Sequence, residues 1–168
     1  LQVLAEMSKI EDIAALADAV PTLSGVVLCA GRGLTLPFLF GSPDKYEEIF
    51  GVNFFAPVEL LRLLVKGKKM GKDSSAVFVC SIGGNQRCTM GNSIYGASKA
   101  ALSSTMRFCA RELAAKKIRV NAVNPGMTNT KLIHSGAITE AQHAADMANY
   151  PLKRYGEPID IALGIVYL

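Results

Sequence analysis

Two kinds of apolar pattern alternate along this chain. Short, mostly apolar runs predict buried strands at residues 25–30, 76–80 and 119–124, because strands covered on both faces lack a polar alternation. Between these runs, apolar residues recur every three or four positions, which predicts helices. The predicted helices begin at residue 8, run from 43 to 66, from about 95 to 116 and from 139 to 148, and begin again at 157.

Two of the predicted helices carry N-terminal signals. Ser8 and Glu11 have the spacing of a capping box, in which each side chain bonds the other residue's backbone N–H. Ser42 precedes Pro43, and proline is favoured at the first helical position because its missing N–H would have no partner there. We therefore expect helices to begin close to these two sites.

Helices that alternate with short strands predict βαβ units and a doubly wound, Rossmann-like α/β fold with a parallel sheet. Residues 1–168 show no repeat or linker, which indicates a single domain. A dinucleotide-binding fold of this kind begins with a glycine-rich turn around the pyrophosphate. The nearest candidate, Gly31 with Gly33, has Leu36 in place of the third glycine. We therefore expect these residues to be a portion of a longer polypeptide, incomplete at both ends.

Composition and charge argue against two classes of partner. The net charge is only +4, and the one basic cluster, at residues 66–72, is typical of a solvated loop rather than of a surface for nucleic acid. The longest apolar stretch, 49–65, is interrupted by Asn53, Glu59 and Arg62, which argues against a membrane span. We expect neither nucleic acid nor a membrane as a partner.

The four cysteines indicate no metal site. Cys29, Cys80, Cys88 and Cys109 lack the CxxC spacing of zinc and redox sites. We therefore expect no metal, no disulfide, and a reducing, cytoplasmic setting.

Tyr95 and Lys99 are the first candidates for chemistry. They lie four positions apart in a predicted helix, so their side chains point the same way. An ammonium favours the ionised form of a phenol, whose ordinary pKa of about 10 is high for proton transfer at neutral pH. Ser81 follows a predicted strand, and ligand sites in parallel sheets lie at the carboxyl ends of strands. The Tyr–Lys spacing alone is a weak motif.

Further motifs surround this pair. They are Asn53 in Gly51-Val-Asn-Phe-Phe55, Ser81-Ile-Gly-Gly84, and Pro125-Gly126 followed by Thr128 and Thr130. In this order, and over nearly the whole chain, they resemble the short-chain dehydrogenases/reductases. Residues 150–162 resemble the 3-oxoacyl-[acyl-carrier-protein] reductase branch. The resemblance implies an oxidoreductase that moves a hydride between NAD or NADP and a ketone or secondary alcohol, including a 3-oxoacyl thioester.

The resemblance implies four catalytic residues. Tyr95 is the general acid or base, Lys99 lowers its pKa and binds the nicotinamide ribose, and Ser81 orients the carbonyl. Asn53 holds a water that relays protons. From the residues alone, Asn53 can instead bond a neighbouring backbone carbonyl, because asparagine is a poor helix former. Other serines compete with Ser81, although serine in a helix usually bonds backbone; they are Ser93, Ser98, Ser103 and Ser104.

The resemblance also implies a set of cofactor contacts. Besides Tyr95 and Lys99, this set comprises Ala30, Gly31, Pro125, Gly126, Thr128 and Thr130. Leu28 and Cys29 depart from the family, which usually has two asparagines there. The departure keeps the backbone contact of Ala30-Gly31 but removes the usual side-chain support of the neighbouring strands.

The expected substrate is a small carbonyl compound or alcohol, free or bound to an acyl carrier protein. Residues 131–150 correspond to the family's substrate lid and carry no readable specificity code; we interpret His134 and His143 within them as surface residues. The helices at 44–66 and around Tyr95 are more apolar than one sheet face requires. This favours a two-fold helix bundle between copies of the chain, and the resemblance implies a homodimer or homotetramer.

Two other interpretations stay open from the sequence. The chain can be a truncated or degenerate relative that acts as a non-catalytic binding or assembly subunit, or an epimerase or dehydratase with the same Tyr–Lys pair. An upstream strand with a glycine-rich turn in the natural polypeptide would favour the reductase. NAD and NADP are not distinguished, since that choice depends on residues after the family's first and second strands.

Overall fold

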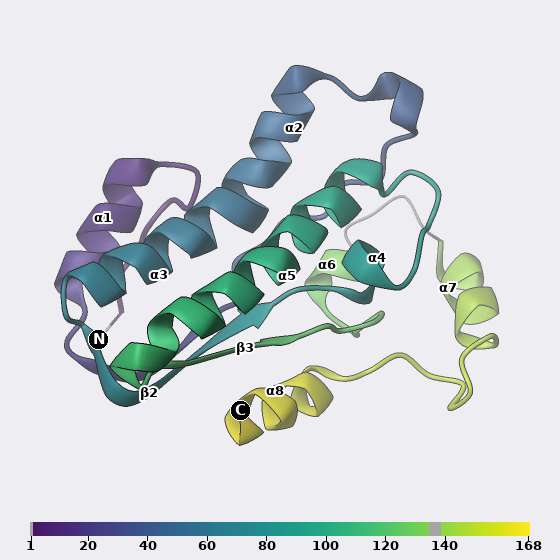
Figure 1. Cartoon of the computed structure of the whole chain (residues 1–168). Helices are drawn as coiled ribbons and strands as arrows, with labels where there is room; N and C mark the ends of the chain where they lie inside the picture. The colour runs from purple at the N-terminus through teal and green to yellow at the C-terminus, as the bar shows by residue number, and fades with distance from the viewer. Residues whose placement is uncertain (1, 135–138) are drawn as a thin grey trace.

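A parallel sheet of three strands forms the centre of the structure, a computed structural model that describes residues 2–134 and 139–168 (Figure 1). Its strands are β1 (Leu23–Leu28), β2 (Met70–Val79) and β3 (Arg119–Val123), with β2 in the middle. All three run in the same direction. The predicted α/β fold with a parallel sheet is confirmed, and the three carboxyl ends lie at one edge.

The predicted strand limits differ from the observed ones at β1 and β2. β1 ends at Leu28, where pairing with Phe78 of β2 stops, whereas the apolar run continues through Cys29 and Ala30. Apolar character does not mark the last hydrogen-bonded pair of a strand. β2 begins at Met70 instead of residue 76, through a segment that is largely polar and exposed.

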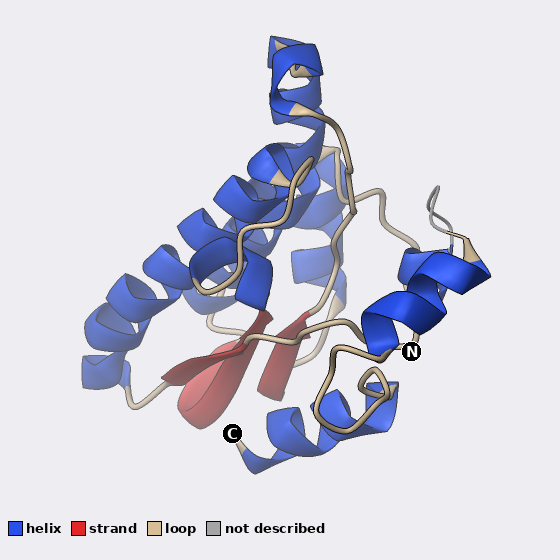
Figure 2. Ribbon diagram, turned by 90° about the vertical axis from the view of Figure 1, so that its right-hand side faces the viewer, coloured by secondary structure: helices blue, strands red, loops and turns tan. Residues whose placement is uncertain are grey.

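Helices cover both faces of this sheet, as Figures 1 and 2 show. On one face lie α2 (Pro43–Phe50), α3 (Ala56–Lys66) and α5 (Ser93–Leu113), and α1 (Ile10–Ala19) packs against α3. On the other face α8 (Pro158–Tyr167) lies beside β3. Shorter elements complete the described part: η1 (Phe38–Phe40), α4 (Ile82–Asn85), η3 (Ala114–Lys116), α6 (Lys131–His134) and α7 (Glu140–Met147). Among the described residues, no helix has the length and apolar character needed to cross a bilayer.

The core lies between the sheet and the helices α3 and α5. Phe78 of β2 is 0% exposed, and Leu64 of α3 and Leu102 of α5 are each 1% exposed. All three belong to one apolar cluster, and all three are among the largest fully buried side chains of the described residues. Full burial of a side chain of this size contributes about 1.5–3 kcal/mol. This packing fixes α3 and α5 against the sheet.

The helix predicted from 43 to 66 contains a π-helical turn, η2 (Gly51–Phe55), between α2 and α3. Asn53 lies in this turn and is 0% exposed. The sequence predicts a regular helix here and gives no sign of the wider turn. Single π-helical turns inside α-helices occur frequently at functional sites.

Both helices begin close to the predicted sites, but one of the two predicted N-terminal signals is wrong. Pro43 occupies the first turn of α2 after Ser42, as predicted. At α1 the N-cap is Lys9, and no side chain caps the helix. The hydroxyl of Ser8 instead donates to Oε1 of Glu6 at 3.0 Å, so the predicted capping box does not form.

Two glycines allow α4 to approach α5 closely. A Cβ atom at Gly84 would lie 2.7 Å from the backbone nitrogen of Ala100. A Cβ atom at Gly96 would lie 2.8 Å from the carbonyl oxygen of Gly83. Both neighbours are backbone atoms, which cannot yield unless a helix moves. These glycines therefore set the distance between α5 and the segment that follows β2.

We expect Gly84→Ala to lower the free energy of unfolding of the full-length protein by about 2 kcal/mol, because the added methyl group overpacks two helices. The matched control is Gly71→Ala on β2, where an added Cβ has no atom within 4 Å. It should change stability by less than about 0.5 kcal/mol. Denaturant unfolding of the three proteins measures both effects, and equal losses in the two variants would contradict the close approach.

Candidate active site

The segments that follow the three strands meet at one edge of the sheet. Gly31 follows β1, Ser81 follows β2, and Pro125 follows β3. The N–H of Ile82 donates to the carbonyl of Pro125 at 3.1 Å, and the N–H of Cys80 donates to the carbonyl of Val123 at 2.9 Å. The sequence places candidate residues in all three segments, and the structure brings them together.

Lys99 reaches this edge from α5. The residue is 4% exposed, and its Nζ donates to the carbonyl of Val79, the last residue of β2, at 2.9 Å. A Cβ atom at Gly31 would lie 3.3 Å from the same Nζ. The ammonium therefore lies between the end of β2 and the backbone of Gly31.

Ser81 and Tyr95 approach each other where α4 packs on α5. Ser81 is the N-cap of α4, and its Oγ accepts from the N–H of Gly83 at 3.1 Å. A Cβ atom at Gly83 would lie 3.4 Å from Ser81 Oγ and 3.9 Å from Cε1 of the Tyr95 ring. The Ser81 side chain interacts with the Tyr95 phenol and favours its ionised form. The structure therefore brings Ser81 close to the Tyr95 ring.

Burial dominates the acid–base properties of Tyr95 and Lys99. It raises the pKa of the Tyr95 phenol; the hydrogen bond with Ser81 opposes this rise and the nearby Cys80 adds to it. Burial also lowers the pKa of Lys99, against the opposing influence of Cys80 and Cys29. In the described residues, loss of hydration outweighs the other influences on the pKa of Tyr95, and the Lys99 ammonium is bound to Val79. That Lys99 lowers the pKa of Tyr95 stays a prediction.

Asn53 connects the segment after β1 to α5. Its Oδ1 accepts from the N–H of Arg32 at 2.7 Å, and its Nδ2 donates to the carbonyl of Arg32 at 2.9 Å and to Ser98 Oγ at 3.1 Å. Asn53 therefore bonds a backbone carbonyl, as the alternative interpretation expects, but that carbonyl lies 21 positions away in sequence. Its role in a proton relay stays a prediction. A Cβ atom at Gly31 would lie 3.5 Å from Asn53 Oδ1, so Asn53 and Lys99 flank the same glycine.

Ser98 also belongs to the site, although its position in a predicted helix indicates only a bond to the backbone. It is 0% exposed, and its hydroxyl donates to the carbonyl of Tyr95 at 2.7 Å while accepting from Asn53. The backbone bond follows from helix geometry, since serine commonly bonds the carbonyl three or four positions earlier. The contact with Asn53, 45 positions away in sequence, has no local signal.

The remaining candidate cofactor residues lie in the segments that follow β1 and β3. Gly31 is exposed and Ala30 is half-buried at the end of β1, and a Cβ atom at Gly126 would lie 3.4 Å from Ile82 of α4. Thr128 is farther along and donates to the carbonyl of Gly126 at 3.3 Å. Thr130 precedes α6, where its carbonyl accepts from the N–H of Ile133 at 3.2 Å.

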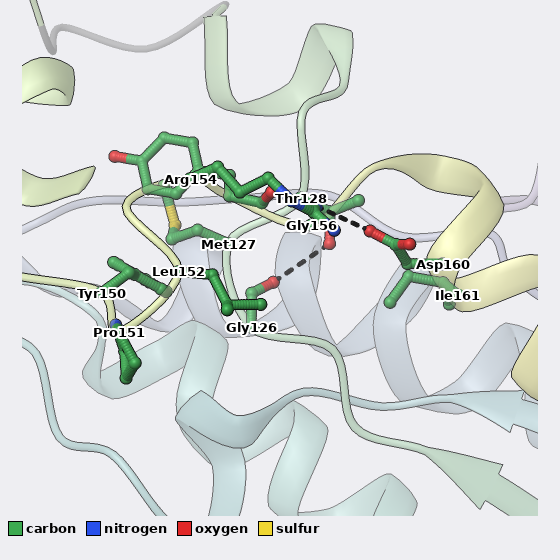
Figure 3. Close-up of a pocket in the computed structure, with 11 residues that line it drawn as sticks. Gly126, Met127, Thr128, Tyr150, Pro151, Leu152, Arg154, Gly156, Asp160 and Ile161 are labelled. Atoms are coloured by element: carbon green, nitrogen blue, oxygen red, sulfur yellow. Dashed lines mark hydrogen bonds and ion pairs between the residues drawn. The ribbon is translucent and has the colours of Figure 1, made fainter. Parts of the chain in front are cut away.

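A pocket of about 460 Å³ opens beside the segment that follows β3 (Figure 3). Residues 126–128 form one wall, and residues from Tyr150 to Ile161 form the other. The ion pair of Arg154 with Asp160, at 2.9 Å, lies within this second wall. The four candidate catalytic residues do not line it, so the pocket adjoins the Tyr95 centre through Gly126 rather than containing it.

The prediction of His143 as a surface residue is wrong. His143 is 6% exposed, and its Nδ1 lies 3.3 Å from the hydroxyl of Tyr155. It lies on the inward side of α7, where the chain after α7 returns to cover it. The side chain of His134 lies outside the described part of the structure. Among the described residues, no group of three His, Cys, Asp or Glu is arranged to hold a metal ion.

The geometry suits proton transfer to a carbonyl oxygen. A phenol with a raised pKa keeps its proton, and Ser81 offers a second hydroxyl at the same point. The exposed backbone at Gly31, the ammonium of Lys99 beside it, and Gly126 fit one side of a nicotinamide nucleotide, since small residues permit close approach and the ammonium offers donors to hydroxyl oxygens.

Comparison with known proteins agrees with this arrangement. Residues 5–168 match the family described as enoyl-(acyl carrier protein) reductase. Acetoacetyl-CoA reductase from Synechocystis sp. is 29% identical over 172 residues, covering 100% of this chain and 70% of that protein. A short-chain dehydrogenase/reductase structure from Brucella melitensis, described as a glucose/ribitol dehydrogenase, is 30% identical with a TM-score of 0.89, covering 100% of this chain and 68% of the other. The structure of 4-hydroxyisoleucine dehydrogenase complexed with NADH is 28% identical, with a TM-score of 0.88, covering 99% of this chain and 70% of that one.

The chain matches only part of each of these proteins. Several further curated relatives are spanned over 50–61% of their length. The matched family region includes all the strands and helices that carry the candidate site. The chain belongs to the short-chain dehydrogenase/reductase family.

Proposed function

We propose that the full-length protein is an NAD(P)-dependent oxidoreductase that transfers a hydride between the nicotinamide and a ketone or secondary alcohol. The observation that carries this proposal is the meeting of the Tyr95 and Ser81 hydroxyls at the carboxyl end of β2, with the Lys99 ammonium held at Val79. Two hydroxyls at one point can hold and protonate a carbonyl oxygen. A positive charge fixed one helical turn away can stabilise the phenolate that remains.

Each residue then has a distinct task. The bound nicotinamide supplies or receives the hydride. Tyr95 donates its proton to the carbonyl oxygen in reduction and takes it back in oxidation, and Ser81 orients that oxygen by a hydrogen bond. Lys99 binds the nucleotide ribose beside Gly31 and stabilises the ionised Tyr95. Asn53 holds the Gly31–Arg32 backbone through Arg32 and supports a proton path to Lys99.

The proposed cofactor contacts extend the site along the sheet edge. The backbone of Ala30 and Gly31 adjoins the nucleotide on the β1 side, and Pro125 and Gly126 adjoin it on the β3 side. Thr128 and Thr130 follow and bind its carboxamide or a phosphate. NAD and NADP are equally compatible with these residues.

We propose a 3-oxoacyl thioester as the substrate class, free or carried on an acyl carrier protein. A relative that covers the whole chain is named acetoacetyl-CoA reductase, and acetoacetyl-CoA is a 3-oxoacyl thioester. The matching family, described as enoyl-(acyl carrier protein) reductase, supports an acyl thioester more generally. The pocket beside Gly126 offers apolar side chains such as Met127 and Leu152 to an acyl chain.

We also propose that the protein assembles as a homodimer or homotetramer in a reducing, cytoplasmic compartment. Phe55 next to α3 and Phe108 on α5 are 60% and 65% exposed, and packing against a second copy would bury them at a gain of about 1.5–3 kcal/mol each. The four cysteines are free, as expected for a reducing compartment.

Tyr95→Phe tests the proposed function most directly. We expect turnover of a 3-oxoacyl-CoA to fall by about 10³-fold, within the range for loss of a general acid, while NADH or NADPH binds nearly as before. Steady-state kinetics and cofactor titration of the full-length protein measure the two quantities. Tyr167→Phe is the control, because Tyr167 is 89% exposed on α8.

Unchanged turnover in Tyr95→Phe would remove Tyr95 from the role of proton donor. No turnover by the unmodified full-length protein with either cofactor, across ketones and 3-oxoacyl thioesters, would instead favour the non-catalytic alternative.

Lys99→Met should separate function from stability. The variant should lose turnover and bind cofactor more weakly, yet at pH 7 its Tm should rise by about 2–4 °C, because a buried ammonium no longer has to be desolvated. The pKa of Lys99 lies below its ordinary value of 10.5 in the folded chain, so the unfolded chain binds more protons between these two values. The burial of Lys99 therefore lowers the free energy of unfolding by its full amount at pH values below the folded-state pKa. This loss of stability decreases as pH rises from that pKa to 10.5.

Thermal unfolding at pH 7 and near pH 10.5 measures this effect, with Lys116→Met at an exposed position as the control. We expect the gain in Tm to shrink at the higher pH. A lower Tm for Lys99→Met at pH 7 would show that the bond to Val79 outweighs the cost of burial.

A further inference from the structure

Arg87 joins the segment after α4 to a distant part of the chain. Its backbone N–H donates to the carbonyl of Ile82 at 2.9 Å, so its position follows that of the segment that begins at Ser81. Its guanidinium donates to the hydroxyl of Tyr150 at 3.2 Å, 63 positions away, and lies 3.7 Å from Oδ1 of Asp146. The guanidinium carbon also lies 6.0 Å from the centre of the Tyr150 ring. One side chain therefore makes three kinds of contact with the region around α7.

The far side of this connection is a buried aromatic cluster. The second oxygen of Asp146, Oδ2, accepts from the hydroxyl of Tyr155 at 2.9 Å. Tyr155 is 5% exposed, and its ring packs edge-on against Tyr150 and His143, at centroid distances of 5.4 and 5.9 Å. Burial and the bond to Asp146 raise the pKa of Tyr155 to about 12. The phenol therefore remains a neutral donor to the carboxylate at physiological pH.

The same two tyrosines form part of the pocket wall. Tyr150 and Tyr155 line the same pocket as residues 126–128, and Figure 3 shows Tyr150 beside Pro151 and Leu152. At the end of this wall, the N–H of Gly156 donates to the carbonyl of Met127 at 3.0 Å, and the N–H of Asn129 donates to the carbonyl of Gly156 at 2.8 Å. The wall is thus attached at one end to the segment after β3 and at the other to Arg87.

We propose that Arg87 is a positioning residue that holds residues 150–155 at a set distance from the Ser81–Tyr95 centre and so fixes the shape of the substrate pocket. This inference rests on the proposed function, in which the pocket receives the part of the substrate beyond its carbonyl. The side chain of Arg87 is 49% exposed, and an ion pair at that exposure contributes little alone. The planar guanidinium reaches two acceptors and an aromatic face together, which a lysine ammonium cannot do.

Hydrogen exchange tests the connection independently of catalysis. In the full-length protein, Arg87→Met should accelerate amide exchange in residues 140–156 by about tenfold and leave α5 unchanged. In Arg87→Lys, the exchange rates of residues 140–156 should lie between those of the wild type and those of Arg87→Met. This variant keeps the charge beside Asp146 but lacks the planar guanidinium. The control is Lys45→Met, which removes a similarly exposed cation, 45% exposed and 2.8 Å from Glu48, on α2. Equal exchange of residues 140–156 in the wild type and in Arg87→Met would overturn the proposal.

Kinetics test the positioning role itself. Arg87→Met should raise KM for the carbonyl substrate by about tenfold and leave kcat within about twofold. The substitution leaves the proton donor unchanged but releases the pocket wall that contacts the substrate. A loss of kcat with KM unchanged would overturn the proposal by showing that Arg87 acts on the Ser81–Tyr95 centre instead. If the wild-type protein reduces no substrate, the proposed function fails, and the exchange measurement alone then decides whether Arg87 holds this wall.

Discussion

Lys99 is 4% exposed, and its ammonium donates to the carbonyl of Val79 at the last position of β2. An ammonium removed from water in this way is costly unless it is hydrogen-bonded, so α5 must lie where Lys99 reaches the end of the strand. That requirement depends on the close contact of α4 with α5, which Gly84 and Gly96 permit. The same contact brings the residue after β2, Ser81, to Tyr95. The apolar packing and the close glycine contacts thus have to place α5 so that this one buried charge meets the end of β2.

The sequence predicts the parts of this arrangement that depend on local pattern. Apolar runs locate the three strands, although not their ends, and helical spacing places Tyr95 and Lys99 on one side of a helix. Because parallel strands end at a common edge, the sequence order alone brings Gly31, Ser81 and Pro125 together. The family resemblance then supplies roles for these residues. Their mutual positions follow from topology, which a single sequence specifies well when strands and helices alternate clearly.

What the sequence does not predict depends on contacts between distant segments. The π-helical turn at Asn53 brings its amide to Arg32 and Ser98, and nothing within the local sequence distinguishes this turn from a regular helix. His143 looks like a surface residue because it lies among Glu140, Gln142 and Asp146, yet Tyr155 covers it from 12 positions away. A local sequence pattern does not indicate which distant segment packs over a helix. The rise in the pKa of Tyr95 has the same origin, since the spacing of Tyr95 and Lys99 is local but their burial is not.

The raised pKa of Tyr95 is consistent with a proton donor in the direction of reduction. A phenol that keeps its proton is ready to donate as soon as a carbonyl oxygen is bound, whereas a phenol already ionised at rest is not. Stabilisation of the phenolate is needed only while the proton is leaving, and an interaction that grows in the transition state accelerates the reaction more than one present throughout. Lys99 fits this requirement because its ammonium is held at Val79 before the reaction and need not move during it. Gly31 and Lys99 would hold a nicotinamide nucleotide here, and the positive charge of its oxidised form would add to the same stabilisation. The burial that opposes ionisation of Tyr95 at rest also strengthens both of these charge interactions when ionisation occurs.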